Sequence, residues 1–270
     1  MQTQGPSSTV EGQRARGDTV IVYHAIGCVP RNAPEFNGFI RPDRFAAQME
    51  YLAQRRRVVD LDALLEHDQS AGPPRVAITF DDAYRSALDH AVPVLRDMGL
   101  PATFFVPTKW IGASNAWDPQ SGVERDLMSA EQLAGLARDG FAVESHGHGH
   151  VDYAGADSQV VEDDVGTSVE QLTHLLGRPP RYLAYPYGRA SPAAAAAAAR
   201  LGLRAAFTLE RPQPVFGRFA VRRTPIFPAD TAPIFALKTT GYYVGWRQAA
   251  PVRAGYRAVR PLVRNRWLWP

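Results

Sequence analysis

The sequence predicts an α/β fold in which about seven short strands close into a single deformed (β/α) barrel. Three observations support this prediction. Short runs of β-branched and aromatic residues alternate with stretches of helical spacing, which is typical of a parallel sheet with helices outside it. The chain has 270 residues, a length at which α/β barrels are commonly one domain. Polar residues directly follow several predicted strands, and the chemistry of closed barrels lies at that end.

Each predicted strand is a short apolar run that ends at polar or turn-forming residues. The predicted strands span residues 19–23, 58–59, 76–80, 102–106, 143–145, 181–185, 203–208 and 219–223. Between two of them lies a long polar loop, 111–126, which contains Trp117. We expect this loop to overhang the carboxyl end of the barrel.

The predicted helices carry start and stop signals. Pro42 opens a helix whose apolar residues recur at helical spacing. Another helix runs from about 84 to 98 and ends before a glycine, and Pro93 should bend it or split it. Ser129 and Gln132 form a capping box at the start of a further helix. The remaining predicted helices span 61–65, 159–176 and the alanine run 193–199, which follows an N-cap serine and a proline.

The charge of the chain is unevenly distributed. The formal net charge is +3, but the segment 246–270 holds six arginines and no acidic residue, so the remainder carries −3. We therefore expect no nucleic acid partner for the body of the protein. The segment also contains three tryptophans, and such a sequence can lie on an anionic membrane surface. The alternative is a basic strap that packs over the barrel.

We expect three parts along the chain: a disordered leader over 1–17, the barrel over 18–245 and the basic aromatic tail over 246–270. No apolar run approaches the roughly 20 residues that span a bilayer, and the first residues lack the apolar stretch of a secretory signal. Cys28 is the sole cysteine, which excludes an internal disulfide. These features predict a location in the cytoplasm or at the cytoplasmic face of the membrane.

Two short polar segments carry the chemistry. The first, 79–82 (Thr-Phe-Asp-Asp), follows the apolar run 76–78, and the second, 146–150 (His-Gly-His-Gly-His), follows 141–143. Together they offer one carboxylate and two imidazoles to a metal, with a second carboxylate left to handle protons. Catalytic zinc takes three protein ligands and keeps one open position. Neighbouring aspartates on a strand point to opposite sides, so both reach one cleft only where the backbone bends.

These segments resemble the carbohydrate esterase family 4 (NodB-homology) polysaccharide deacetylases. The segment 79–82 matches the first motif of that family, and His146 and His150 match the histidine pair of its second motif. The segment 184–188 (Ala-Tyr-Pro-Tyr-Gly) looks like the third motif. The resemblance runs from about residue 20 to residue 241, and it implies a NodB-like barrel with a metal-dependent amidohydrolase site.

The resemblance also implies a role for each residue. Asp82, His146 and His150 would hold one divalent metal, with zinc expected and cobalt, nickel or iron as alternatives. Asp81 would be the general base. The backbone N–H of Tyr187, together with the metal, would stabilise the oxyanion. The alternatives are that the aspartates only cap a helix and that the third motif is only a turn.

His148 lies between the two histidines of the second motif. A spacing of two residues directs it away from them, and the family pattern skips this position. We interpret it as a residue at the rim of the site.

The chain departs from the family pattern in its third motif. That motif usually begins with arginine, and here Ala184 stands in its place. The arginine that orients the catalytic aspartate must then come from elsewhere. Arg223 is the candidate, because Phe219, Val221 and Arg223 alternate onto one face of a predicted strand while Arg222 points outward.

The last motif of the family, Leu-x-His near the C-terminus, is also absent, since no histidine follows His174. His24, at the end of the first predicted strand, resembles the poly-β-1,6-N-acetylglucosamine deacetylase branch, in which the motif order is circularly permuted and a first-strand histidine is the general acid. The form of the third motif resembles the same branch. The alternative for His24 is a buried core histidine.

The expected reaction is hydrolysis of the N-acetyl group of an N-acetylhexosamine in a glycan or glycolipid, which releases acetate and a free amine. Three alternatives stay open. The same site could cleave a sugar O-acetyl ester. A non-haem iron oxygenase uses the same ligand set, although the second aspartate and the barrel pattern argue against it. A non-catalytic carbohydrate-binding relic is suggested by the missing arginine and histidine. The sequence leaves the linkage of the substrate and the oligomeric state open.

Overall fold

Seven parallel strands close into a barrel in the part of the chain that this computed structural model describes, residues 17–28, 39–66, 72–209 and 216–243. The barrel closes because β1 pairs with β10 on one side and with β5 on the other. In spatial order the strands are β1 (Thr19–Tyr23), β10 (Val221–Pro225), β9 (Ala205–Thr208), β8 (Tyr182–Ala184), β7 (Ala142–Ser145), β6 (Ala102–Val106) and β5 (Arg75–Phe80). The predicted α/β barrel is confirmed.

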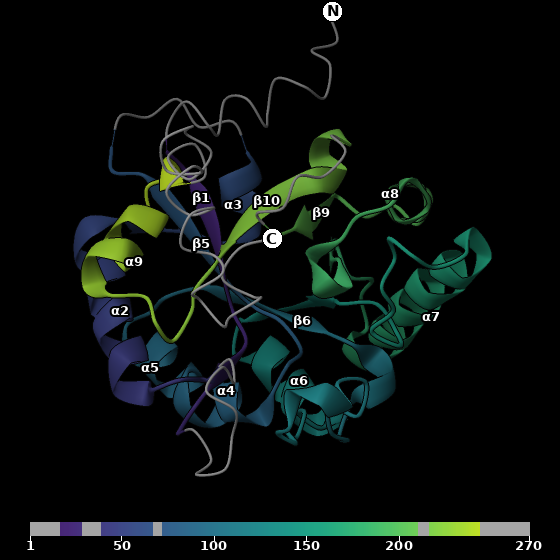
Figure 1. The fold of residues 1–270 in the computed structure, drawn as a ribbon, viewed down its shortest axis with the longest axis horizontal. Coiled ribbons are helices and arrows are strands. Elements are labelled where there is room, and N and C mark those ends of the chain that lie inside the picture. The colour runs from purple at the N-terminus through teal and green to yellow at the C-terminus, as the bar shows by residue number, and fades with distance from the viewer. Residues whose placement is uncertain (1–16, 29–38, 67–71, 210–215, 244–270) are drawn as a thin grey trace, which may run out of the picture.

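Three shorter strands lie beside the barrel. β4 (Arg57–Val58) pairs with the start of β5, and β2 (Ala25–Ile26) pairs with β3 (Phe39–Ile40) in a separate two-stranded sheet. Helices surround the strands in Figure 1. The α-helices are α2 (Pro42–Arg55), α3 (Leu61–Leu65), α4 (Arg85–His90), α5 (Val92–Asp97), α6 (Ala130–Arg138), α7 (Ser158–Leu176), α8 (Pro192–Arg200) and α9 (Ala232–Lys238). The short 3₁₀ turns are η1 (Thr108–Trp110), η2 (Pro119–Ser121), η3 (Pro186–Gly188) and η4 (Gly217–Ala220).

The capping signals read from the sequence form as predicted. Ser129 accepts a hydrogen bond from the Gln132 N–H, and the Gln132 side chain accepts one from the Ser129 N–H, so the capping box at α6 is complete. The Ser191 side chain caps α8. Pro93 lies in the first turn of α5, and the predicted helix over 84–98 is split into α4 and α5 just before it.

One predicted strand begins too early. The strand predicted over 219–223 starts only at Val221, because Phe219 belongs to the turn η4. The Phe219 N–H bonds to the Phe216 carbonyl, and the Phe219 carbonyl accepts a bond from the Tyr185 hydroxyl, so its backbone has no place in the strand ladder. The inward face of β10 therefore rests on Val221 and Arg223.

The barrel interior is apolar at the amino-terminal ends of the strands and polar at their carboxyl ends. Val20, Ala77 and Val221 belong to one buried cluster, which Leu61 and Leu64 of α3 extend at the amino-terminal end of the barrel. Successive strand residues alternate between inside and outside, so the inward positions recur at every second residue. Continuing this alternation toward the carboxyl end of β1, β5 and β10 leads to His24, Asp81 and Arg223.

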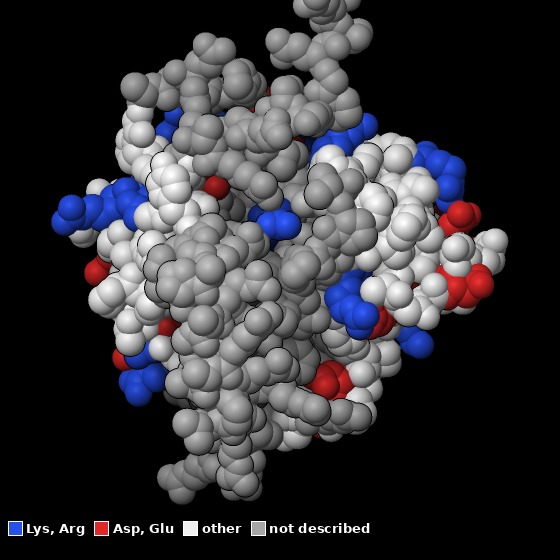
Figure 2. Space-filling model, turned by 45° about the horizontal axis from the view of Figure 1, so that its top comes forward, with Lys and Arg blue, Asp and Glu red and all other residues white. Residues whose placement is uncertain are grey.

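Figure 2 shows one face of the molecule, on which the basic and acidic side chains of the described residues are interspersed. On this face they form no broad basic surface of the kind that tracks nucleic acid. The predicted leader, apart from Gly17, and the tail 246–270 lie outside the described residues. No helix in the described ranges is both long enough and apolar enough to cross a bilayer.

Candidate active site

The residues singled out in the sequence meet at the carboxyl end of the barrel. All the barrel strands are parallel, so polar residues that follow different strands share one rim. The site residues that follow or end strands are His24 after β1, Asp81 and Asp82 after β5, His146 after β7, Tyr187 in η3 after β8, and Arg223 within β10.

Asp82, His146 and His150 form a compact ligand set. Their candidate ligand atoms lie within 4.8 Å of one another, and all three residues are buried. The Asp82 Oδ1 atom lies 3.2 Å from His150 Nε2 and 3.5 Å from His146 Nε2. The His146 Nδ1–H donates to the Ala184 carbonyl at 2.8 Å, which leaves the Nε2 lone pair free to face the other two ligands.

The same cluster contains a carboxylate oxygen that receives no hydrogen bond from the residues that the structure describes. This atom is Asp82 Oδ1, which is buried, and buried polar atoms without a partner are rare. Burial alone raises the pKa of the Asp82 carboxyl, but the adjacent His146 and His150 hold that pKa well below its usual range. A buried, ionised oxygen between two imidazole nitrogens fits a divalent cation.

Asp81 is held by Arg223. The guanidinium donates from Nη1 and Nη2 to the two carboxylate oxygens, at 2.6 and 2.7 Å, and Arg223 is 0% exposed. Arg223 thus faces Asp81 from β10, on the face that strand alternation predicted. Burial raises the pKa of Asp81, but the charge of Arg223 prevails and lowers it, with a further contribution from His146. Asp81 is therefore an ionised, fixed carboxylate beside the ligand set.

A backbone bend lets both aspartates face one site. Asp82 has a φ of 67° and Ala83 a φ of 49°, so the chain leaves β5 in the left-handed region. The non-glycine residues with positive φ in the described ranges are these two, His150 and Tyr187. All four belong to the site or adjoin it, and local backbone strain of this kind is typical of functional sites.

His24 adjoins both aspartates. It is half-buried between β1 and β2, and Asp82, Asp81, Arg223 and His146 all act on its charge. Burial lowers the pKa of the imidazole, while the two carboxylates oppose that shift. The geometry admits the predicted role as an acid, which stays a prediction.

Tyr187 lies in a turn against the ligand set. Its ring meets the His150 ring edge-on, with centroids 4.7 Å apart. Gly188, which follows it, has a φ of +65°, and a Cβ there would collide with the Leu209 side chain. The turn therefore requires glycine at this position. The predicted oxyanion role of the Tyr187 N–H stays a prediction.

The loop 111–126 brings an aromatic cluster to the site. The Trp117 ring stacks on His150, with centroids 4.7 Å apart at 23°, as the predicted overhang requires. The sequence did not identify Tyr84 and Trp110, whose rings lie 6.4 and 5.5 Å from that of Trp117.

His148 stays outside the ligand set, and its Nδ1 lies 3.0 Å from the Thr108 hydroxyl.

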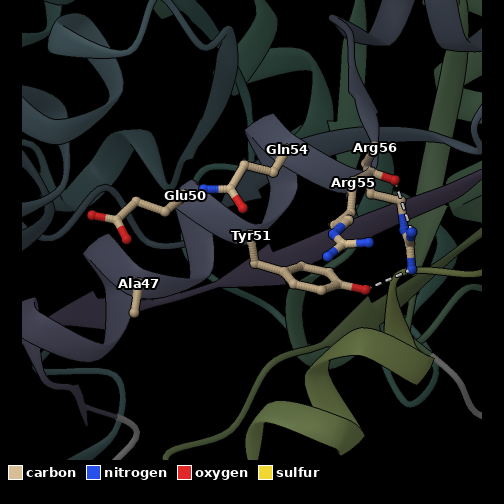
Figure 3. A pocket seen from close by; sticks show the side chains of 6 residues that line it. All are labelled: Ala47, Glu50, Tyr51, Gln54, Arg55 and Arg56. Carbon is tan, nitrogen blue, oxygen red and sulfur yellow. Dashed lines mark hydrogen bonds between the residues drawn. The ribbon is translucent and has the colours of Figure 1, made fainter.

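A pocket of about 410 Å³ lies elsewhere, on the outward face of α2 (Figure 3). Its lining contains none of the site residues. Arg56 in this pocket bonds to the Tyr51 hydroxyl and to backbone carbonyls of α9 and its end. The lining residues are Ala47, Glu50, Tyr51, Gln54, Arg55 and Arg56. We assign this pocket no part in the chemistry.

The chain matches the family model described as polysaccharide deacetylase over residues 68–206, just over half of its length. The chain belongs to the polysaccharide deacetylase family. The members of this family are carbohydrate deacetylases that depend on a metal. The cluster of Asp82, His146 and His150 in this chain fits that dependence. It brings three ligand atoms together, and the one from Asp82 is a buried oxygen with no hydrogen bond from the described residues.

Two curated proteins are similar in sequence over most of the chain. It is 26% identical over 226 residues to the polysaccharide deacetylase-like protein YxkH of Bacillus subtilis, covering 80% of this chain and 74% of that one. It is 27% identical over 186 residues to the poly-β-1,6-N-acetyl-D-glucosamine N-deacetylase of Staphylococcus epidermidis, covering 64% of this chain and 62% of that protein. The chain thus spans less than two thirds of the staphylococcal protein.

Two solved structures show the same fold. IcaB of Ammonifex degensii superposes with a TM-score of 0.69 at 25% identity, covering 83% of this chain and 97% of that one. The deacetylase PplD of Streptococcus pyogenes, solved with acetate, superposes with a TM-score of 0.68 at 22% identity, again covering 83% of this chain and 97% of that one.

Proposed function

We propose that this protein removes the N-acetyl group from N-acetylhexosamine units of a glycan or glycoconjugate. The observation that carries the proposal is the Asp81–Arg223 pair, which places a fixed, ionised carboxylate beside three convergent metal ligands. The relative from Staphylococcus epidermidis bears the name of a poly-β-1,6-N-acetylglucosamine deacetylase. The first substrate to test is therefore a β-1,6-linked N-acetylglucosamine oligomer.

Asp82, His146 and His150 would hold one divalent metal, and zinc suits two imidazoles and a carboxylate. When bound there, the cation supplies a Lewis acid for the amide carbonyl and lowers the pKa of a water ligand. The remaining chemistry belongs to side chains and backbone of this protein.

Asp81 would accept the proton of the attacking water. Its carboxylate is ionised because Arg223 lowers its pKa, and the two guanidinium hydrogen bonds fix its orientation. A positioned base of this kind typically contributes 10²–10⁴-fold to the rate. Arg223 would therefore act through Asp81 and replace the arginine that the third motif lacks.

His24 would donate a proton to the leaving nitrogen. The amide C–N bond breaks as water forms a new C–O bond, so that acetate and the protonated amine leave. The Tyr187 N–H would donate to the oxyanion while the carbonyl carbon is tetrahedral. Burial lowers the pKa of His24, and the nearby carboxylates of Asp82 and Asp81 only oppose that shift, so the proposed acid role rests on the place of His24 beside the site and not on its pKa.

Acetate release tests the function directly. We expect release from β-1,6-linked N-acetylglucosamine oligomers by the full chain loaded with zinc, and its loss on chelation. Oligomers with other linkages and O-acetylated sugars serve as parallel substrates. Release from the ester alone would favour a carbohydrate esterase, and zinc binding without any release would favour a carbohydrate-binding relic. The hydrogen bonds from Arg223 to Asp81 argue against the carbohydrate-binding relic, because the missing motif arginine was one of the two reasons to consider it.

The proposed place in the cell rests on the sequence of the segment 246–270. Its arginines would be attracted to the anionic lipids of the cytoplasmic leaflet. We propose a cytoplasmic location with peripheral attachment to that leaflet. Salt-sensitive sedimentation with anionic vesicles, compared between the full chain and a chain ending at residue 245, tests the attachment. Equal sedimentation of the two would contradict it.

A further inference from the structure

The histidine loop, residues 146–150, is held through its backbone as well as through its rings. The three N–H groups of 147–149 all reach side-chain acceptors. The Gly147 N–H donates to Ser145 Oγ at 3.1 Å, and the His148 N–H donates to Asp164 Oδ2 at 2.8 Å. The Gly149 N–H donates to Asp164 Oδ1 at 2.6 Å. One carboxylate of α7 therefore takes two successive N–H groups of the loop.

The carbonyls of the same three residues bond on another side, to η1. The Thr108 N–H donates to the Gly147 carbonyl at 3.1 Å, and the Lys109 N–H donates to the His148 carbonyl at 3.0 Å. The Trp110 indole N–H donates to the Gly149 carbonyl at 3.3 Å. All six backbone polar groups between His146 and His150 are thus satisfied, which leaves the loop little freedom to move.

Asp164 is itself fixed from a third direction. The Tyr153 hydroxyl donates to Asp164 Oδ2 at 2.6 Å, and both residues are buried. The glycines of the loop make room for this pair. Gly147 has a φ of +74°, and a Cβ there would lie 2.6 Å from Asp164 Oδ2 and would also strike the Tyr153 hydroxyl. A Cβ on Gly149 would lie 3.1 Å from Asp164 Oδ1.

We infer that Asp164, anchored by Tyr153, is a positioning residue for the metal: it holds the loop in the conformation that brings His146 and His150 together on Asp82. This inference rests on the metal site of the proposed function. Among the described residues, the hydrogen bonds of Asp164 come from two backbone N–H groups and the Tyr153 hydroxyl, and none comes from a ligand atom. Its effect passes through the backbone between the two histidines, so it should appear in metal affinity before it appears in chemistry.

Asp164→Asn tests whether the two carboxylate acceptors matter, because asparagine fills nearly the same space as aspartate. An amide has one acceptor oxygen and two N–H donors, so it cannot accept both the His148 and Gly149 N–H groups in the manner of a carboxylate. At least one part-buried backbone donor of the loop then loses its partner. We expect zinc to bind about 10-fold more weakly or worse, the range typical for groups that orient metal ligands. The absorption spectrum of the cobalt-substituted protein should shift as the ligand geometry relaxes.

Asp163→Asn is the matched control. Asp163 is the preceding residue of α7, it is exposed, and its carboxylate accepts only a side-chain bond from Gln159 at 2.9 Å among the contacts that the structure describes. The substitution removes the same charge from the same helix. We expect zinc affinity and cobalt spectrum to match those of the natural chain. The unfolding free energy of each metal-free variant is measured alongside.

Equal zinc affinity in folded Asp164→Asn and Asp163→Asn proteins would overturn the inference. If Asp164→Asn does not fold, Tyr153→Phe decides, because it removes one hydroxyl and leaves the carboxylate in place. A several-fold loss of zinc affinity is expected there, and an unchanged affinity would overturn the inference. Failure of the natural chain to release acetate, with zinc bound tightly, would refute the proposed reaction and leave the role of Asp164 standing.

Discussion

The two ends of the barrel both bury carboxylates, and they treat them differently. At the amino-terminal end, Asp18 accepts three bonds from Arg75: from its backbone N–H, its Nε and its Nη2. At the carboxyl end, Asp82 Oδ1 accepts no hydrogen bond from any residue in the described ranges. The two side chains are equally hidden, with 2% of Asp18 and 7% of Asp82 exposed. Burial therefore does not explain the difference.

Two further acids near the amino-terminal end of the barrel are also hydrogen-bonded. Near the start of β8, Glu144 accepts bonds from the Tyr182 N–H and the Arg178 side chain, and Asp62 accepts from Tyr182 and Arg204. The non-glycine residues with positive φ in the described ranges, by contrast, lie at or beside the carboxyl-end site. These amino-terminal carboxylates are hydrogen-bonded and stabilise the fold, whereas the carboxyl end combines the hydrogen-bonded Asp81 with a strained backbone and one unsatisfied oxygen of Asp82.

The largest effect should come from breaking the ligand set. His150→Ala should lose bound metal and with it all measurable acetate release, because two remaining ligands hold zinc poorly. His148→Ala is the control, since it lies in the same loop and outside the cluster, and it should keep most of both. Metal content by elemental analysis and acetate release measure the pair. Loss of metal in His148→Ala with retention in His150→Ala would show that the ligand assignment is wrong.

The next largest effect should distinguish the role of Asp81 as a base from that of Asp82 as a metal ligand. Asp81→Asn should keep its metal and lose turnover by about 10²-fold or more, since a base is removed and no ligand is. Turnover and metal content are measured on the same preparation. A variant with near-normal turnover would remove Asp81 from the role of base.

These residues could be predicted because their signals are local. The pairs Asp81–Asp82 and His146–His150 stand directly after strands, and Arg223 could be found from strand alternation even though β10 starts later than expected. What the sequence could not predict depends on contacts between distant segments. The carboxylate of Asp164 meets the histidine loop across 15 or 16 positions of the chain. The left-handed backbone at Asp82 could not be predicted in detail either, since non-glycine residues rarely adopt it.

His24 provides a sharper test of the carboxyl end. His24→Ala should bind metal normally and lose about 10²-fold or more on the amide substrate, since a poor leaving group needs a proton. It should lose less on an activated aryl acetate, whose leaving group departs without one. Rates on both substrates are compared, and the alkaline limb of the pH–rate profile should change in the variant. Equal losses on amide and ester, or loss of the metal, would remove His24 from the role of acid.

A substitution at the amino-terminal end of the barrel should have the smallest effect on activity. The same substitution should have the largest effect on stability. Asp18→Asn removes the carboxylate charge that pairs with the buried Arg75, and breaking a buried pair in this way typically costs 3–5 kcal/mol of unfolding free energy. Acetate release per folded molecule should stay near that of the natural chain, because Arg75 and Asp18 lie at the end of the barrel opposite the site.

Asp82→Asn should give the reverse result and so completes the comparison. The substitution removes a buried charge that His146 and His150 attract but whose Oδ1 accepts no hydrogen bond within the described residues, so the metal-free protein should lose less stability than Asp18→Asn, while metal binding and acetate release fail. Urea denaturation of the metal-free proteins and acetate release give the two measurements for each variant. If Asp82→Asn destabilised the metal-free protein as much as Asp18→Asn does, the Asp82 carboxylate would be part of the scaffold, and the division between the two ends would not hold.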